Sequence, residues 1–297
     1  MIALAPPAVV AAAPASAPAS LESAFLALRF SERAISDPAS VLASDASAAD
    51  KLAAIDALHS RIPSAPLAFK IAALDALAAG AGGPGQPAEV RAKALTFLGY
   101  AMPQVEDDAA RGRALAVLLA AINSPAYRIF ALRGLGPACH GLPKADETSF
   151  QTGLLDLLDG SIAGEERETA LVSLYSFVST RDDLAKRAPA LVASLDARLL
   201  GPLDADPARF AGDARYTPGA RALAIATVWS SARHRQSLGQ SAPAERVHLL
   251  LIRLAAVETD ATVLGWIQIY RDAAPARPAP ALRDSTTRRA PAGPDEP

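Results

Sequence analysis

This 297-residue sequence is poor in the residues that build disulfides, metal sites and β-strands. Its single cysteine, Cys139, excludes an internal disulfide framework, and its four histidines form no cluster with the spacing of zinc ligands. Aromatic residues make up only 5% of the chain, which weighs against a β-sheet. The formal charge of −2 supplies no field that would attract a nucleic acid or an anionic membrane. We therefore expect no metal, no cofactor and no nucleic-acid partner.

The two ends of the chain lack an apolar period. Residues 1–19 carry no charged side chain, and prolines interrupt them too often for a membrane-spanning helix. We interpret this stretch as a disordered leader in a cytoplasmic protein. The alternative is a degenerate export signal of a periplasmic or secreted protein whose true start lies upstream. Residues 275–297 mix proline, alanine and arginine, so we expect a disordered tail.

What the sequence does contain is apolar residues at helical spacing. Alanine, the strongest helix former, is abundant throughout. Val90, Ala94, Phe97, Leu98 and Ala101 follow one another at i, i+4, i+7, i+8 and i+11, which places them on one helix face. Similar stripes recur along the chain, separated by short stretches with prolines and capping residues. Each stripe needs a neighbouring helix to cover it.

A short motif, Arg-x-x-Ala-(Leu/Ile), occurs four times. Its arginines are Arg91, Arg128, Arg167 and Arg221, at intervals of 37, 39 and 54 residues. A period of about 40 residues that contains two helices is typical of stacked helical repeats, because one helix pair cannot bury its own apolar face. We expect these arginines to be structural, with their stems on the neighbouring pair and their guanidinium groups bound to turn carbonyls or acids.

The segments VRAKAL at 90–95 and YRIFAL at 127–132 resemble the opening of the second helix of a HEAT repeat. The resemblance implies an all-α fold, a right-handed α-α superhelix (solenoid) of about five to six HEAT-like helical hairpins. This domain would span residues 20–274, with 20–60 as an atypical cap. The hairpins that the resemblance implies are 65–79 with 88–101, 105–122 with 125–137, 147–159 with 164–179, 183–199 with 217–234, and 243–257 with 260–273.

The sequence departs from this family in its turns. Gln86, Asn123 and Thr217 stand where the family often has an aspartate that pairs with an arginine of a neighbouring repeat. In the last pair, Leu264 replaces the motif arginine. These departures affect the polar contacts between turns and leave the helical stripes intact.

Several patterns suggest catalytic or ligand chemistry but lack the context that the chemistry needs. Residues 80–85 match GxGxxG after an expected helix, whereas a dinucleotide-binding loop follows a strand. The acids Asp204 and Asp206 lack the glycine and the second acid of a calcium loop. Cys139 and His140 have no adjacent acid to orient them. We expect surface or packing positions for the other histidines, His59, His234 and His248. The sequence therefore predicts that the protein is not an enzyme.

The long interval between the third and fourth motifs points to a candidate binding site. The excess falls in residues 200–216, which we interpret as an insertion inside a hairpin. Insertions in helical repeats map to loops on one face, often the binding face, although a tolerated surface loop is the alternative. The candidate partner-binding residues of the insertion are Arg209, Phe210, Arg215 and Tyr216. Trp229 and Trp266, on the second helices of the last two pairs, are either core residues or anchors for a partner.

The leading functional hypothesis is a non-enzymatic scaffold that binds a protein or peptide on the concave face of the stack and on the 200–216 loop. One alternative is a DNA-associated protein that resembles the HEAT-like alkylpurine DNA glycosylases, against which the near-neutral charge weighs. Another alternative is a chromophore-lyase-like subunit, because these degenerate repeats also resemble that family. The pattern favours no particular oligomeric state.

Overall fold

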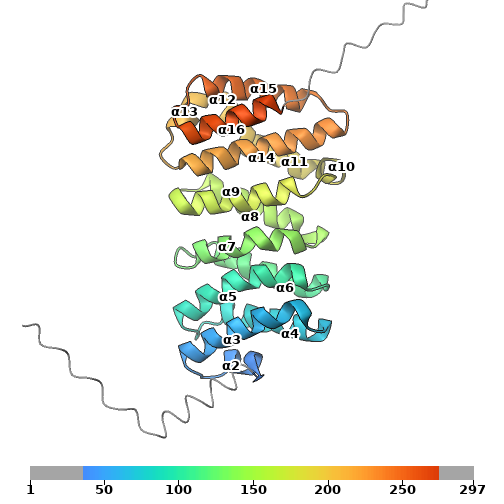
Figure 1. The fold of residues 1–297 in the computed structure, drawn as a ribbon, viewed down its shortest axis with the longest axis vertical. Coiled ribbons are helices and arrows are strands. Elements are labelled where there is room, and N and C mark those ends of the chain that lie inside the picture. Colours follow the sequence, from blue (N-terminus) through green and yellow to red (C-terminus); the bar gives the residue numbers. More distant parts are fainter. Residues whose placement is uncertain (1–35, 274–297) are drawn as a thin grey trace, which may run out of the picture.

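The computed structural model describes residues 36–273, and every secondary-structure element in that range is helical (Figure 1). The expected leader at 1–19 and tail at 275–297 lie outside the described residues. Apart from a segmented stretch after Arg181, the α-helices are α2 (Pro38–Ala43), α3 (Ala48–Arg61), α4 (Leu67–Gly82), α5 (Ala88–Ala101), α6 (Asp108–Ala121), α7 (Arg128–Ala138), α8 (Glu147–Asp159), α9 (Gly164–Ser179), α14 (Pro218–Ser237), α15 (Ala242–Ala255) and α16 (Ala261–Asp272).

The boundaries of these helices agree with the expected hairpins to within about one helical turn. Side-chain caps stand at several starts, as where Asp107 accepts a hydrogen bond from the backbone N–H of Ala110. Thr217 caps α14 in the same way through the backbone N–H of Ala220. The prediction of an all-α protein is therefore confirmed for the described range.

The stretch between α9 and α14 differs from the expectation of one helix at 183–199 followed by a loop. It forms short segments, each with a buried apolar side: α10 (Leu184–Arg187), α11 (Pro189–Leu195), a π-helical turn (Asp196–Leu200), α12 (Gly201–Ala205) and α13 (Pro207–Gly212). The breaks coincide with Pro189, Pro202 and Pro207, which stand in the first turns of α11, α12 and α13. The interpretation of 200–216 as a loop is therefore wrong.

The helices form two layers that run side by side along the molecule. In one layer, α3, α5, α7, α9, α14 and α16 contact one another in that order. In the other, α2, α4, α6 and α8 do so, followed by α11 to α13 and then α15. We call these the second-helix layer and the first-helix layer, after their place in each pair; α7, α9, α14 and α16 lie in front in Figure 1. One continuous apolar cluster runs between the layers, from Leu42 to Tyr270.

Ion pairs join corresponding helices of successive pairs. Three of them are Lys93–Asp56, Arg113–Asp75 and Arg198–Asp159. The partners are 37, 38 and 39 residues apart. This separation matches the 37- and 39-residue intervals of the arginine motif, so the same repeat appears in the sequence and in the contacts.

The second helices approach most closely where glycines face each other. Gly99 of α5 lies against Gly134 of α7, and a Cβ added to Gly99 would overlap the Gly134 carbonyl. Trp229 of α14 occupies the position that corresponds to Gly99, because each lies at the same distance in sequence from the motif arginine of its helix. At this position of α14 there is a ring in place of a glycine, and the ring packs on Tyr270 of α16. The contact between neighbouring second helices therefore changes along the stack from backbone on backbone to ring on ring.

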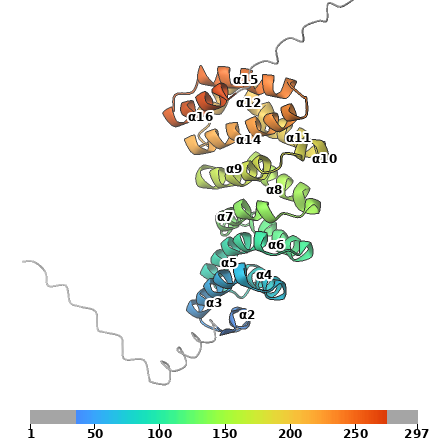
Figure 2. The same ribbon diagram turned by 45° about the vertical axis from the view of Figure 1, so that its right-hand side comes forward.

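The stack is curved, with the second-helix layer on its inner side. In Figure 2, this layer curves inward at α7, and the first-helix layer bulges outward there. On the outer side, a hollow of about 410 Å³ lies between α6 and α8, lined in part by Leu119, Ile122 and Gly153. Because the second helices meet through glycine where the first helices stand apart, the stack bends toward the second-helix layer.

Candidate functional site

The motif arginines bind the turns of their own helix pairs. The Nε of Arg128 donates to the carbonyl of Ile122 at 2.8 Å. Arg167, which is almost completely buried, donates to the carbonyls of Ile162 and Gly160 at 2.9 and 3.2 Å. These bonds satisfy carbonyl groups that a helix end leaves without a helical partner.

Each motif arginine also contacts the pair that follows. The contacted residues are Tyr127 for Arg91, Glu166 for Arg128, Tyr216 for Arg167 and Glu258 for Arg221. Lys51 makes an equivalent contact in the first pair, where it donates to Gln86 at 2.8 Å. Tyrosine, glutamate and glutamine side chains thus connect each pair to the next. These contacts occupy the guanidinium groups, so the motif arginines do not form an open basic stripe.

The four candidate residues of the insertion lie in two environments. Phe210 is buried, and its ring meets the half-buried ring of Tyr216 edge-on, with centroids 5.0 Å apart. Arg209 and Arg215 are exposed and line an open hollow of about 450 Å³ with Asp213. Hydrogen bonds from Arg215 lower the pKa of Asp213. Phe210 and Tyr216 are therefore packing residues, which leaves only the two arginines accessible to a partner.

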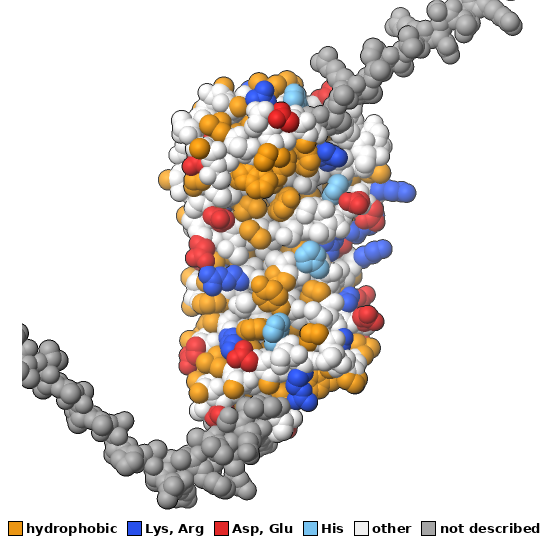
Figure 3. All heavy atoms as spheres, in the orientation of Figure 1, with side chains coloured by type: hydrophobic (Ala, Val, Ile, Leu, Met, Phe, Trp, Pro, Cys, Tyr) orange, Lys and Arg blue, Asp and Glu red, His pale blue; other side chains and the backbone are white. Residues whose placement is uncertain are grey.

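The two tryptophans lie together at the C-terminal end of the second-helix layer. Trp229 and Trp266 flank Tyr270, with ring centroids 4.6 and 5.7 Å from the tyrosine ring. The guanidinium of Arg233 lies 4.9 Å from the Trp229 ring. Trp266 is 42% exposed and Ile269 is 57% exposed. Figure 3 shows hydrophobic side chains gathered over α14 and α16. We call Trp229, Arg233, Trp266, Ile269 and Tyr270 the aromatic patch.

Tyr270 holds the aromatic patch in place. Burial raises the pKa of its phenol to about 12, so the group stays protonated at neutral pH. The nearby phenol of Tyr175 of α9 acts in the same direction on this pKa. Tyr270 thereby links α9, α14 and α16, and it fixes the ring against which the exposed Trp266 stacks. The outer ring of the aromatic patch, that of Trp266, therefore rests on a buried aromatic ring.

Sequence reasoning identified the tryptophans but missed the other members of the aromatic patch. Ile269 and Tyr270 follow Trp266 by three and four residues, and Arg233 follows Trp229 by four. Residues at these spacings share a helix face, so the signal was present in the sequence. What the sequence did not indicate is that α14 and α16 bring their rings into contact.

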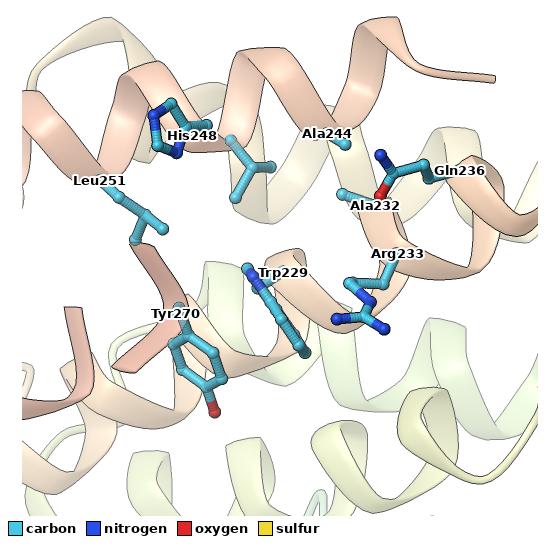
Figure 4. Close-up of a pocket in the computed structure, with 9 residues that line it drawn as sticks. Trp229, Ala232, Arg233, Gln236, Ala244, His248, Leu251 and Tyr270 are labelled. Carbon is cyan, nitrogen blue, oxygen red and sulfur yellow. The ribbon is translucent and has the colours of Figure 1, made fainter. Parts of the chain in front are cut away.

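A small hollow opens between α14, α15 and α16 beside the aromatic patch. In Figure 4, Trp229 stands between Tyr270 and Arg233, with His248 and Leu251 across from it on α15. The hollow measures about 20 Å³, enough for one water molecule. Pockets for small molecules are typically about 300–1,000 Å³. The geometry therefore suits contact with a macromolecular surface better than enclosure of a metabolite.

The cysteine and the histidines do not form a reactive group. Cys139 is fully buried, and burial raises the pKa of its thiol to about 11, so the nucleophilic thiolate is scarce at neutral pH. His140 is exposed, and His59 packs edge-on against an aromatic ring of α5. Burial lowers the pKa of His234, which lies 3.4 Å from Asp182. These are packing or surface positions.

A buried carboxylate near Cys139 ties α8 to the segments that follow α9. Glu147 is 3% exposed and accepts hydrogen bonds from Arg181 at 2.8 Å and from Arg187. Burial acts to raise the pKa of Glu147, but the hydrogen bonds from Arg187 and Arg181 outweigh it and lower the pKa below 4.5. Arg181 also donates to the Cys139 carbonyl at 2.6 Å. Because the carboxylate is held charged between two arginines, Glu147 serves as a structural residue.

Among residues 36–273, no three or more histidine, cysteine or acidic side chains gather closely enough to hold a metal ion. None of the described helices is long and apolar enough to cross a bilayer.

Comparisons with known proteins give no identification. No protein-family model, curated protein or solved structure matches this chain. Its function is therefore inferred from its own residues.

Proposed function

We propose that this protein is a non-enzymatic scaffold that binds a protein or peptide segment through the aromatic patch. The observation that carries the proposal is the exposure of Trp266 and Ile269 next to a supported tyrosine and an arginine. Tryptophan, tyrosine and arginine dominate the few residues that supply most of the energy of protein interfaces. In a monomer, apolar side chains clustered on one face and rimmed by polar groups mark an interaction surface.

We propose further that the stack is a right-handed, HEAT-like α-solenoid of about six hairpins. Three observations support it: helices contact their counterparts in chain order, ion pairs recur at the repeat interval, and the motif arginines link each pair to the next. In such stacks, the extended concave surface is the usual binding surface. The aromatic patch belongs to α14 and α16 of the second-helix layer, and this layer is on the inner side of the curve.

The proposed primary contact is the aromatic patch rather than the insertion. Phe210 is buried, and the insertion packs in the first-helix layer against α15. A partner could reach Arg209 and Arg215 only as a secondary contact at the edge of the stack. Substituting these exposed arginines is therefore a milder test of the insertion than deleting it, because deletion would remove the buried Leu203 and Phe210.

The proposal is tested by a pair of double substitutions. In affinity capture from the native host, Trp266→Ala with Ile269→Ser should reduce the captured partner by more than about tenfold, since hot-spot truncations cost about 2 kcal/mol each. The control, Leu249→Ser with Ile252→Ser, changes comparably exposed aliphatic residues of α15 in the first-helix layer. Capture should survive the control substitutions. Equal capture by both variants, or equal loss, would contradict the proposal, provided that circular dichroism shows both variants to be folded.

A further inference from the structure

We propose that the aromatic patch recognises proline-rich segments, and that residues 274–282 of this same chain are its resident occupant. This inference rests on the proposed function and deepens it by naming the chemistry of the bound segment. The segment lies outside the described residues, so the argument starts from the point at which the described chain ends.

The chain leaves α16 beside the aromatic patch. Ile269 and Tyr270 belong to the last turn of α16, which ends at Asp272. Arg233, the residue that covers Trp229, donates a hydrogen bond to the carbonyl of Ala273 at 3.4 Å. One side chain therefore contacts both the aromatic patch and the backbone from which the next segment continues.

The chemistry of that segment suits an aromatic surface. Residues 274–282 read APARPAPAL, with Pro275, Pro278 and Pro280 within six positions. Proline favours the extended polyproline II conformation, which loses little entropy on binding. Aromatic-lined surfaces bind such segments by stacking rings against the proline faces. Trp266, with its supported and partly exposed ring, offers that surface.

Distance and effective concentration both permit the contact. Trp266 precedes Ala273 by seven residues, about 10 Å along the helix axis. Five residues in the polyproline II conformation span about 15 Å, so residues 274–278 can reach the ring. A short tether gives an effective concentration on the order of 1 mM, so even millimolar affinity would keep the segment docked about half of the time. Docking then competes with any external partner of the aromatic patch.

Tryptophan fluorescence of the full-length chain tests this inference. The chain has two tryptophans, Trp229 and Trp266, and both belong to the aromatic patch. Replacing Pro275, Pro278 and Pro280 by alanine should expose Trp266, raise the acrylamide quenching constant by roughly 1.5- to 2-fold and shift the emission to the red. The matched control, Pro291→Ala with Pro294→Ala, should leave both unchanged.

A synthetic peptide of residues 274–284, added to the triple variant, should restore the protection, and Trp266→Ala should abolish that effect. Equal quenching in the native protein and the triple variant would overturn the inference. Protection that disappears on dilution would also overturn it and would identify a second copy as the occupant. The two experiments distinguish failure of this inference from failure of the proposed function. Affinity capture reports on an external partner, whereas acrylamide quenching reports on the chain's own segment. Quenching can therefore change when no partner is captured, and a partner can be captured when quenching is unchanged.

Discussion

Arg167 illustrates how a charged residue becomes part of the core of this protein. Only 1% of its surface is exposed, yet its guanidinium bonds two turn carbonyls and lies 4.5 Å from the Tyr216 ring. The motif predicts the contact with the turn, because the turn is local. The contact with Tyr216 was not predictable, because that residue belongs to an insertion whose path depends on prolines and on a π-helical turn.

Glu147 gives a prediction at the same scale. Replacing it by glutamine should lower the free energy of unfolding by about 2–4 kcal/mol, because Arg181 and Arg187 would lose the charge that compensates theirs in a partly buried site. Chemical denaturation at pH 7 measures this change. Glu165→Gln serves as the control, since its pair with Arg133 is exposed to solvent and should contribute little.

The same variant carries a pH dependence with a defined sign. The pKa of Glu147 in the folded protein lies below its ordinary 4.5, so in acid the unfolded chain binds the additional proton. The contribution of this carboxylate is therefore complete above about pH 4.5 and declines as the pH falls through the folded pKa. The stability difference between the native protein and Glu147→Gln should shrink as the pH is lowered from 7 toward 3. A difference that grows in acid would contradict this assignment.

At the scale of elements, amphipathic stripes predicted most helix boundaries, and backbone contacts decided how the helices meet. The helices at 88–101, 147–159 and 164–179 begin and end as expected, because their stripes and turn residues are local signals. The segmented stretch after α9 differs, because three prolines interrupt its stripe while its apolar residues still face the core. The helical spacing of the apolar residues alone did not indicate whether this stretch would fold into short helices or remain a loop.

Glycine gives the prediction for elements. Gly99→Ala should destabilise the protein by about 1–3 kcal/mol or more, because its Cβ would overlap the Gly134 carbonyl and push α5 away from α7. Gly265→Ala, inside α16 with open space around the added Cβ, should instead stabilise the protein by about 0.5–1 kcal/mol. Thermal unfolding of the two variants checks both signs. Similar shifts in the same direction would argue against the glycine contact as the reason for the close approach.

At the scale of the whole molecule, the core is a continuous strip between two layers, so each helix pair depends on its neighbours. Such an arrangement leaves long outer surfaces on both layers. Several of their charged groups pair with residues of adjacent helix pairs, as Arg198 does with Asp156 and Asp159. The aromatic patch differs because the exposed apolar side chains of Trp266 and Ile269 lie beside a cluster of aromatic rings at one end of the second-helix layer.

The candidate site was only partly predictable. The sequence indicated Trp229 and Trp266 as candidates because they are large aromatic residues on the second helices, and it indicated the insertion because of its length alone. In the structure, the tryptophans lie around Tyr270, whereas Phe210 is buried. The two tryptophans, although distant in sequence, therefore indicated the candidate site better than the irregular insertion did. Their grouping depends on the stacking of α14 on α16, which no local pattern encodes.

Site-specific photo-crosslinking tests the central claim most directly. A photoactivatable side chain would replace either Ile269 in the aromatic patch or Leu249 on α15, two aliphatic residues that are 57% and 59% exposed in different layers. In the native host, we expect a cross-link to a partner protein or peptide from position 269 and none from position 249. Equal cross-linking from both positions, or cross-linking from position 249 alone, would contradict the account.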